Sequence, residues 1–111
     1  MEAGDDSSVS EYLHDFVAAA PETIAALRQS LEEGSFDEVS RLAHNLKGSS
    51  LFLGIDALAG MADRLELASE RHDPNEVASV LSQIQAKIAE IVSILQSSTS
   101  PPPNDDLPGS P

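Results

Sequence analysis

The sequence predicts an all-helical fold, and three observations support this prediction. Alanine and leucine, which lead the helix-propensity scale, dominate the apolar content with 14 and 13 residues. The aromatic residues that favour strands are scarce, with three Phe, one Tyr and no Trp. In the middle of the chain, apolar residues recur at helical spacing between short breaks. Because short loops favour antiparallel neighbours, we expect an antiparallel up-and-down four-helix bundle in one small domain.

The first helical segment is expected to start near Ser8 or Ser10, where Ser8 and Glu11 have capping-box spacing. It should end before Gly34, which suits a C-cap. Pro21 interrupts the segment because it lacks the helical N–H and clashes with the preceding turn. The segment is therefore expected to be either a kinked first helix or an extra short N-terminal helix followed by a second piece.

Two further helices follow in the middle of the chain. The second is expected to begin at Ser35, whose spacing to Glu38 is again that of a capping box, and to end near Gly54. The third is expected to run from about Asp56 to Arg71.

The fourth helix has the clearest start signal. Asp73, Pro74 and Glu76 occupy the positions of an N-cap, a first-turn proline and an acidic residue three after the cap. Its apolar residues alternate in spacing between four and three, which predicts a bundle-type stripe: Val77, Leu81, Ile84, Ile88, Ile91 and Leu95.

Composition divides the chain into three parts. Residues 1–8 are small and acidic, and we expect a disordered N-terminus there. Residues 9–96 form the predicted helical domain. Residues 97–111 are rich in Pro, Ser and Asp, which predicts a disordered tail or linker.

Several classes of function are disfavoured by composition. The absence of Cys removes thiolate chemistry, and three scattered His give no metal-ligand spacing, so we expect no metal or cofactor in the chain itself. The net charge is −13; five acidic residues lie in the ends, which leaves −8 for the middle. Such a chain repels nucleic acid. The N-terminus does not resemble a signal peptide, and no continuous apolar run approaches the about 18 residues that span a membrane. We therefore expect a cytoplasmic monomer without direct membrane contact.

The segment over residues 41–54 has an unusual polar face. At about 100° per residue, His44 points away from the apolar stripe. Arg41 and Gly48 flank it on one side, Lys47 flanks it on the other, and Leu51 lies close to its direction. The expected core stripe consists of Val39, Leu42, Ala43, Leu46, Ser49, Ser50 and Leu53. On the third helix, Asp63, Arg64 and Glu66 are expected to form a solvated face.

This face has the chemistry for phosphoryl transfer. A neutral imidazole can act as a nucleophile near neutral pH, and Lys47 can offset phosphate charge. A glycine inside a helix costs about 1 kcal/mol relative to alanine, so Gly48 suggests close approach of another molecule. The exposed Leu51 suggests a dry contact beside it. Ser49 and Ser50, in contrast, are expected to serve helix packing rather than catalysis.

The run His44-Asn45-Leu46-Lys47-Gly48-Ser49-Ser50, followed by Gly54, resembles the H-x-L-K-G-S-[SA]-x-x-x-[LIV]-G signature of histidine phosphotransfer (HPt) domains. The resemblance covers about residues 8–96. It implies a four-helix bundle with the phosphorylated histidine midway along the second long helix. It also implies receiver-domain partners, which supply Mg²⁺ and the phosphorylated aspartate.

The leading hypothesis is thus reversible phosphotransfer from a receiver aspartate to His44 and on to another receiver. His44 is the expected phosphoacceptor and Lys47 its electrostatic support, while Arg41, Gly48 and Leu51 are expected to contact the partner. One alternative is the phospho-accepting substrate domain of a chemotaxis-type histidine kinase, in which His44 is phosphorylated by an ATP-binding domain that this chain lacks. Another is a non-signalling helical adaptor. The sequence leaves open the cognate receivers, the direction of phosphate flow and the phosphorylated ring nitrogen.

Overall fold

The computed structural model describes residues 2–99, with side chains over residues 11–96. Within this range it contains four helices and no strand, which confirms the predicted all-helical class. The helices are α1 (Glu2–Glu32), α2 (Phe36–Leu53), α3 (Asp56–Glu70) and α4 (Pro74–Thr99).

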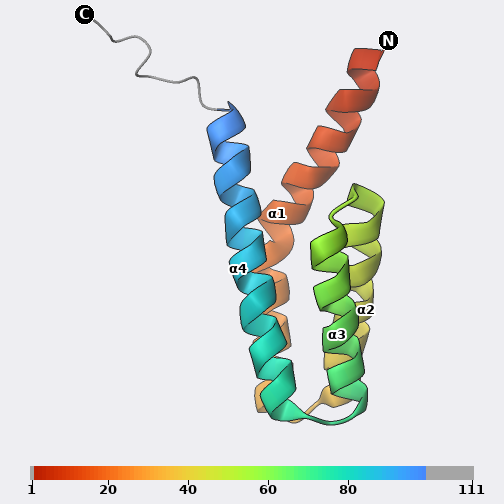
Figure 1. Ribbon diagram of the computed structural model, residues 1–111, viewed down its shortest axis with the longest axis vertical. Coiled ribbons are helices and arrows are strands. Elements are labelled where there is room, and N and C mark those ends of the chain that lie inside the picture. Colours follow the sequence, from red (N-terminus) through yellow and green to blue (C-terminus); the bar gives the residue numbers. More distant parts are fainter. Residues whose placement is uncertain (1, 100–111) are drawn as a thin grey trace, which may run out of the picture.

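The helices are arranged as a bundle in which the chain changes direction at each turn (Figure 1). The α1–α2 and α3–α4 turns lie at one end, and the α2–α3 turn lies at the other. Each helix packs against two neighbours: α2 against α1 and α3, and α4 against the same two. The ends of α1 and α4 extend past the α2–α3 turn (Figure 1). Within residues 2–99, the helix neighbours of α2 are α1 and α3.

The core is formed by aliphatic side chains from all four helices. Its largest fully buried members are Leu27 of α1, Val39 of α2, Leu58 and Leu65 of α3, and Leu81 and Ile84 of α4. Alanines complete the core where helices approach one another, and Ala43, Ala62 and Ala68 have no exposed surface. Burying a Leu or Ile side chain contributes about 1.5–3 kcal/mol, so these contacts dominate the stability of the bundle.

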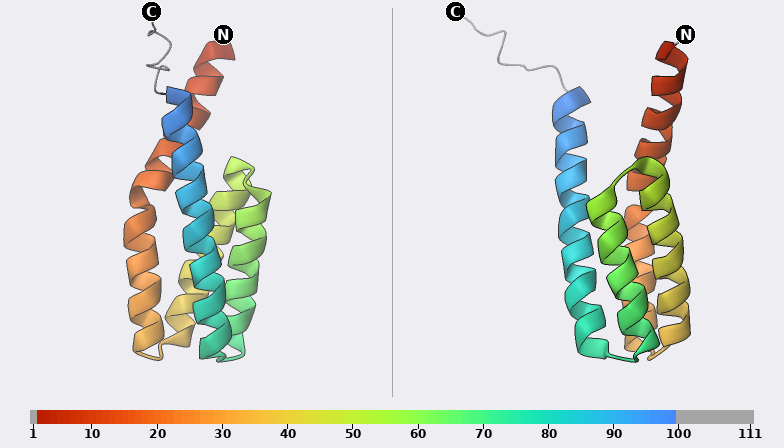
Figure 2. Two further views of the ribbon diagram at one scale, coloured as in Figure 1. Left: turned by 60° about the vertical axis from the view of Figure 1, so that its left-hand side comes forward. Right: turned by 45° about the vertical axis from the view of Figure 1, so that its right-hand side comes forward.

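Pro21 bends α1 without dividing it. The helix is continuous from Glu2 to Glu32, but it changes direction in its orange middle part (Figure 2). Proline cannot donate the amide hydrogen bond to the preceding turn, and its ring pushes that turn away. Of the two predicted forms, the structure has the kinked first helix. It also starts this helix at Glu2, before the expected start near Ser8.

Glycines end the first two helices as predicted. Gly34 and Gly54 have positive φ angles of 71° and 76°, the left-handed conformation that glycine adopts without a Cβ clash. The amides of Gly54 and Ile55 donate to the carbonyls of Leu51 and Ser50, which satisfies the last turn of α2.

Ser35 occupies the predicted N-cap of α2, but the predicted capping box does not form. The Ser35 side chain makes no capping hydrogen bond. Glu38 turns instead to Arg41, one turn along the same helix. The Glu38 carboxylate is therefore engaged in an exposed ion pair along the helix and not in a capping box.

The start of α4 follows the prediction closely. The Asp73 carboxylate accepts a hydrogen bond of 3.1 Å from the amide of Glu76, and Pro74 opens the helix. The stretch Pro74–Gln96 is long and apolar enough, by length and composition alone, to cross a membrane. Its apolar stripe is largely accounted for by the core, because Val77, Leu81, Ile84 and Ile88 are buried there.

The ends of the chain differ in part from expectation. The predicted disordered N-terminus, residues 1–8, overlaps the first turns of α1. The predicted tail begins at residue 97, whereas α4 continues to Thr99. The remainder of that tail lies outside the described residues. Inside the domain, α3 ends at Glu70, one residue before the predicted end, and Arg71 is its C-cap.

Candidate functional site

His44 lies in the middle of α2 on the face opposite the core. Its side chain is 67% exposed, whereas Val39, Ala43 and Leu46 of the same helix are buried. The helical periodicity that places these apolar residues inward therefore places the imidazole outward. The predicted exposure of the His44 side chain is confirmed.

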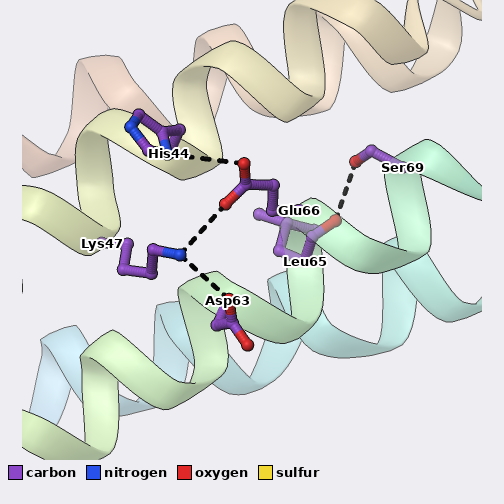
Figure 3. A network of polar contacts seen from close by, with 6 residues as sticks. All are labelled: His44, Lys47, Asp63, Leu65, Glu66 and Ser69. Carbon is purple, nitrogen blue, oxygen red and sulfur yellow. Dashed lines mark hydrogen bonds and ion pairs between the residues drawn. The ribbon is translucent and has the colours of Figure 1, made fainter.

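A carboxylate of α3 faces the imidazole ring (Figure 3). Oε2 of Glu66 lies 3.4 Å from Nδ1 of His44, and the Glu66 side chain is only 18% exposed. This contact favours the neutral tautomer that carries its proton on Nδ1, because the carboxylate then faces an N–H group. In that tautomer, Nε2 holds the free lone pair.

The ammonium of Lys47 lies between two carboxylates of α3 (Figure 3). Its Nζ is 3.0 Å from Oδ1 of Asp63 and 3.4 Å from Oε1 of Glu66. The hydrogen bond with Asp63 is the main cause that raises the pKa of Lys47, and the charges of both carboxylates raise it further. Lys47 is thus a fully charged side chain held one turn along α2 from His44.

The expected solvated face on α3 is only partly correct. Arg64 is half exposed and reaches towards α4, where it contacts Gln83 and Glu76. Glu66 instead faces α2, and its Oε1 is buried without a hydrogen bond. No local sequence pattern marked this orientation, because it depends on how α3 packs against α2.

Arg41 is exposed on the side of His44 that the helical wheel predicts. Its guanidinium donates two hydrogen bonds to the Glu38 carboxylate, of which the Nε–Oε1 bond measures 3.1 Å. These bonds are the main cause that lowers the pKa of Glu38. The positive charge of Arg41 is therefore largely matched by a neighbour on its own helix.

Two large apolar side chains are exposed about two turns along α2 from His44. Leu51 is 58% exposed, as predicted, and Phe52 beside it is 71% exposed. The Phe52 ring meets Tyr12 of α1 edge-on, with 5.5 Å between the ring centres. The sequence analysis missed these two aromatic residues, although Phe52 was visible as a large apolar residue in the motif region.

A groove of about 610 Å³ lies between α1 and α2, and we call it the α1–α2 groove. Its lining includes Tyr12 and Phe16 from α1, and Asn45, Gly48 and Phe52 from α2. Gly48 is exposed, and a Cβ atom built on it would meet no atom within 4 Å. The absence of a side chain at this position therefore serves no packing contact within the described residues.

The two serines after Gly48 have different environments. Ser50 is buried, as expected for a residue that serves helix packing. Its hydroxyl donates a 2.8 Å hydrogen bond to the Leu46 carbonyl. Ser49 was placed at the edge of the core stripe, but it is exposed and lines the α1–α2 groove. The groove that Ser49 lines is formed jointly by α1 and α2, which single-helix geometry could not predict.

The comparison with known protein families agrees with this geometry. The model of the Hpt domain family matches residues 11–94, from α1 to the last turns of α4. The chain belongs to the Hpt domain family. Hpt domains carry out histidine phosphotransfer in two-component signalling and interact there with receiver domains. No curated protein and no solved structure matches the chain.

The carboxylates and imidazoles of the Hpt domain are not clustered as a metal site would require. Within the described residues, no three His, Asp or Glu side chains come together as a metal site. Its polar side chains near His44 are instead arranged as a chain of contacts from the imidazole through Glu66 and Lys47 to Asp63. This arrangement can orient an imidazole and partly balance the charge of a phosphoryl group.

Proposed function

We propose that His44 is the phosphoacceptor of this Hpt domain and that it exchanges its phosphoryl group with receiver aspartates. The observation that supports this proposal is the contact between Nδ1 of His44 and Oε2 of Glu66, at 3.4 Å, on a ring that is 67% exposed. The contact reserves Nδ1 for its proton and leaves Nε2 as the nucleophile. The scaffold is an antiparallel up-and-down bundle with a kinked first helix.

In the forward step, the lone pair of Nε2 attacks the phosphorus of a phosphoaspartate on the receiver. The N–P bond forms while the bond from phosphorus to the aspartate oxygen breaks, and that bonding pair stays on the oxygen. The ring becomes a phosphoimidazolium that keeps its proton on Nδ1, where the Glu66 carboxylate offsets the positive charge. In the reverse step, an aspartate oxygen attacks phosphorus and the neutral imidazole leaves.

The remaining roles are divided between the domain and its partner. Lys47 offsets part of the phosphoryl charge, since phosphoryl transfer depends mainly on positioning and electrostatics. Arg41, Gly48 and Leu51 belong to the surface that meets the receiver, and the receiver supplies Mg²⁺. The domain acts as a monomer in the cytoplasm, either alone or as part of a membrane-bound sensor kinase.

The direct test is phosphorylation of the full chain by a panel of receiver domains loaded with acetyl phosphate and Mg²⁺. We expect an acid-labile label on the wild-type protein and none on His44→Gln. His14→Gln, which changes another exposed histidine, is the matched control and should accept label normally. Circular dichroism should be the same for all three proteins, because His44 lies outside the core.

The donor distinguishes the proposal from its main alternative. A relay domain takes phosphate from a phosphorylated receiver. The substrate domain of a chemotaxis-type kinase would instead need ATP and a kinase catalytic domain in trans. Label on His44→Gln from any donor would contradict the assignment of the phosphoacceptor.

A further inference from the structure

Asp63 holds the Lys47 ammonium before any phosphoryl group arrives. Its Oδ1 lies 3.0 Å from Nζ of Lys47, the shorter of the two carboxylate contacts of that ammonium. Asp63 and Glu66 are three residues apart, so both occupy the side of α3 that faces α2 (Figure 3). The ammonium is therefore shared between two carboxylates.

The charges around His44 leave the site short of positive charge. Lys47 contributes one positive charge, while Asp63 and Glu66 contribute two negative charges. The other cation on this face of α2, Arg41, is held by the Glu38 carboxylate. A phosphoryl group adds about 1.5 to 2 further negative charges near neutral pH. The phosphorylated site therefore has too few cations for its three anionic groups.

We infer that Asp63 competes with the phosphoryl group on His44 for the Lys47 ammonium, and so keeps the phosphohistidine a strong phosphodonor. Asp63 is in these terms a positioning residue, because it acts through Lys47 and does not contact the imidazole. This inference rests on the proposed function of His44. It assigns a role to a residue whose sequence context indicated only a solvated surface.

The geometry distinguishes Asp63 from Glu66 in this role. Glu66 is 18% exposed and contacts the imidazole as well as Lys47, so it cannot change partner freely. Asp63 is half exposed, and Lys47 is its ion-pair partner within the described residues. Water can solvate the Asp63 carboxylate when the ammonium turns to the phosphoryl group. The exchange of partners thus requires only a change in the Lys47 side chain.

The competition predicts the direction in which the phosphotransfer equilibrium moves. Asp63→Asn keeps the shape of the side chain and removes its charge. Lys47 then becomes more available, and the repulsion of the phosphoryl group falls. We expect the ratio of phosphorylated to unphosphorylated His44 to rise roughly three- to tenfold, as for one unit charge several ångströms away in a partly screened setting.

The probe is potassium phosphoramidate, a small donor that reads the transfer potential without a receiver. The phosphorylated fraction is measured by ³¹P NMR on the full chain at fixed phosphoramidate and ammonium concentrations. Glu90→Gln is the matched control: it removes one charge from a 3.0 Å lysine pair on α4, and Lys87 there is as exposed as Lys47. The control should keep the wild-type ratio of phosphorylated to unphosphorylated His44. Asp63→Glu, which keeps the negative charge, should have a ratio close to that of the wild type.

A second measurement separates the mechanism from a structural effect. In the unphosphorylated protein, Asp63→Asn should lower the pKa of Lys47, followed by NMR of its side chain. In a Lys47→Ala background, Asp63→Asn should have a clearly smaller effect on the phosphorylated ratio. An unchanged ratio in Asp63→Asn, with wild-type His44 phosphorylated, would overturn this inference alone. If wild-type His44 accepts no phosphate from phosphoramidate or receivers, the proposed function fails, and the inference fails with it.

Discussion

Gly48 leaves an open surface one turn from His44, and this openness can be tested at the level of one residue. A Cβ atom there would meet nothing within 4 Å, so the fold should accept a side chain. Gly48→Ala should stabilise the bundle by up to about 1 kcal/mol, because helix-interior glycine is costly. Gly48→Gln should keep its melting temperature, yet transfer from a receiver should fall by roughly tenfold or more if the receiver approaches over the α1–α2 groove.

Gly60 provides the matched comparison for this prediction. It lies on α3, and a Cβ atom there would also meet nothing within 4 Å. Gly60→Gln should be equally stable and should transfer normally. If it impairs transfer as strongly as Gly48→Gln, the receiver approaches over α3 instead of the groove. If Gly48→Gln unfolds the bundle, the absence of a side chain at position 48 serves internal packing.

The Glu66 carboxylate leads to a prediction about the imidazole itself. In Glu66→Ala, the partner of Nδ1 is lost, so the ring should shift towards the tautomer protonated on Nε2. Phosphorylation by phosphoramidate should slow by roughly tenfold, at the low end for positioned acid–base groups because the site is exposed. Nitrogen-15 spectra of the His44 ring report the tautomer, and Glu70→Ala, an exposed change on the same helix, is the control. An unchanged tautomer ratio would remove Glu66 from the mechanism.

For single residues around His44, the sequence predicted the direction of a side chain but not its partners. The outward direction of His44, Gly48 and Leu51 followed from the period of one helix. The contacts of Lys47 and Glu66 depend on how α3 is rotated and shifted against α2, and no local pattern encodes that register. Their partners therefore became visible only in the folded bundle.

At the scale of helices, local sequence chemistry predicts the helix boundaries, and two N-caps show which part of the capping geometry it predicts. Asp73 was predicted as the N-cap of α4, and it accepts a 3.1 Å hydrogen bond from the amide of Glu76. Ser35 was predicted as the N-cap of α2, and it occupies that position without a side-chain bond. Sequence spacing thus predicts where a helix starts, but it does not decide whether the side-chain bonds of a capping box form.

This difference predicts that removing the two capping side chains lowers the stability of the domain by unequal amounts. Asp73→Ala should destabilise the domain by about 1 kcal/mol, since the amide of Glu76 loses its partner. For a domain of this size, that corresponds to a fall in melting temperature of about 4–8 °C. Ser35→Ala should cost clearly less, because no side-chain bond is lost. Thermal melts of both variants provide the measurement, and equal costs would show that the capping contact of Asp73 adds nothing.

For the whole molecule, four helices of the right order and approximate length could be predicted, because breaks and apolar stripes mark them along the chain. The direction of α1 after Pro21 could not be predicted. A proline indicates a kink or a break, but the angle of the kink depends on how the helix packs. The α1–α2 groove is lined by side chains from both helices, so it depends on how they pack together. It was therefore outside the reach of any single-helix argument.

The location of the core predicts which part of the chain the domain needs. Among the residues whose side chains the structure describes, 11–96, the buried apolar residues of the core lie between Ala20 and Ile88. A chain that ends at Gln96 should keep its melting temperature within about 2 °C and should accept phosphate on His44 at the full rate. A chain that ends at Gln83 loses Ile84 and Ile88 and should not fold, since each large core side chain contributes several kcal/mol with its surrounding contacts. Melting curves and phosphorylation by phosphoramidate on the two truncations give the comparison. A large loss of stability in the chain that ends at Gln96 would mean that the C-terminal segment contributes to the fold beyond the core that the bundle contains.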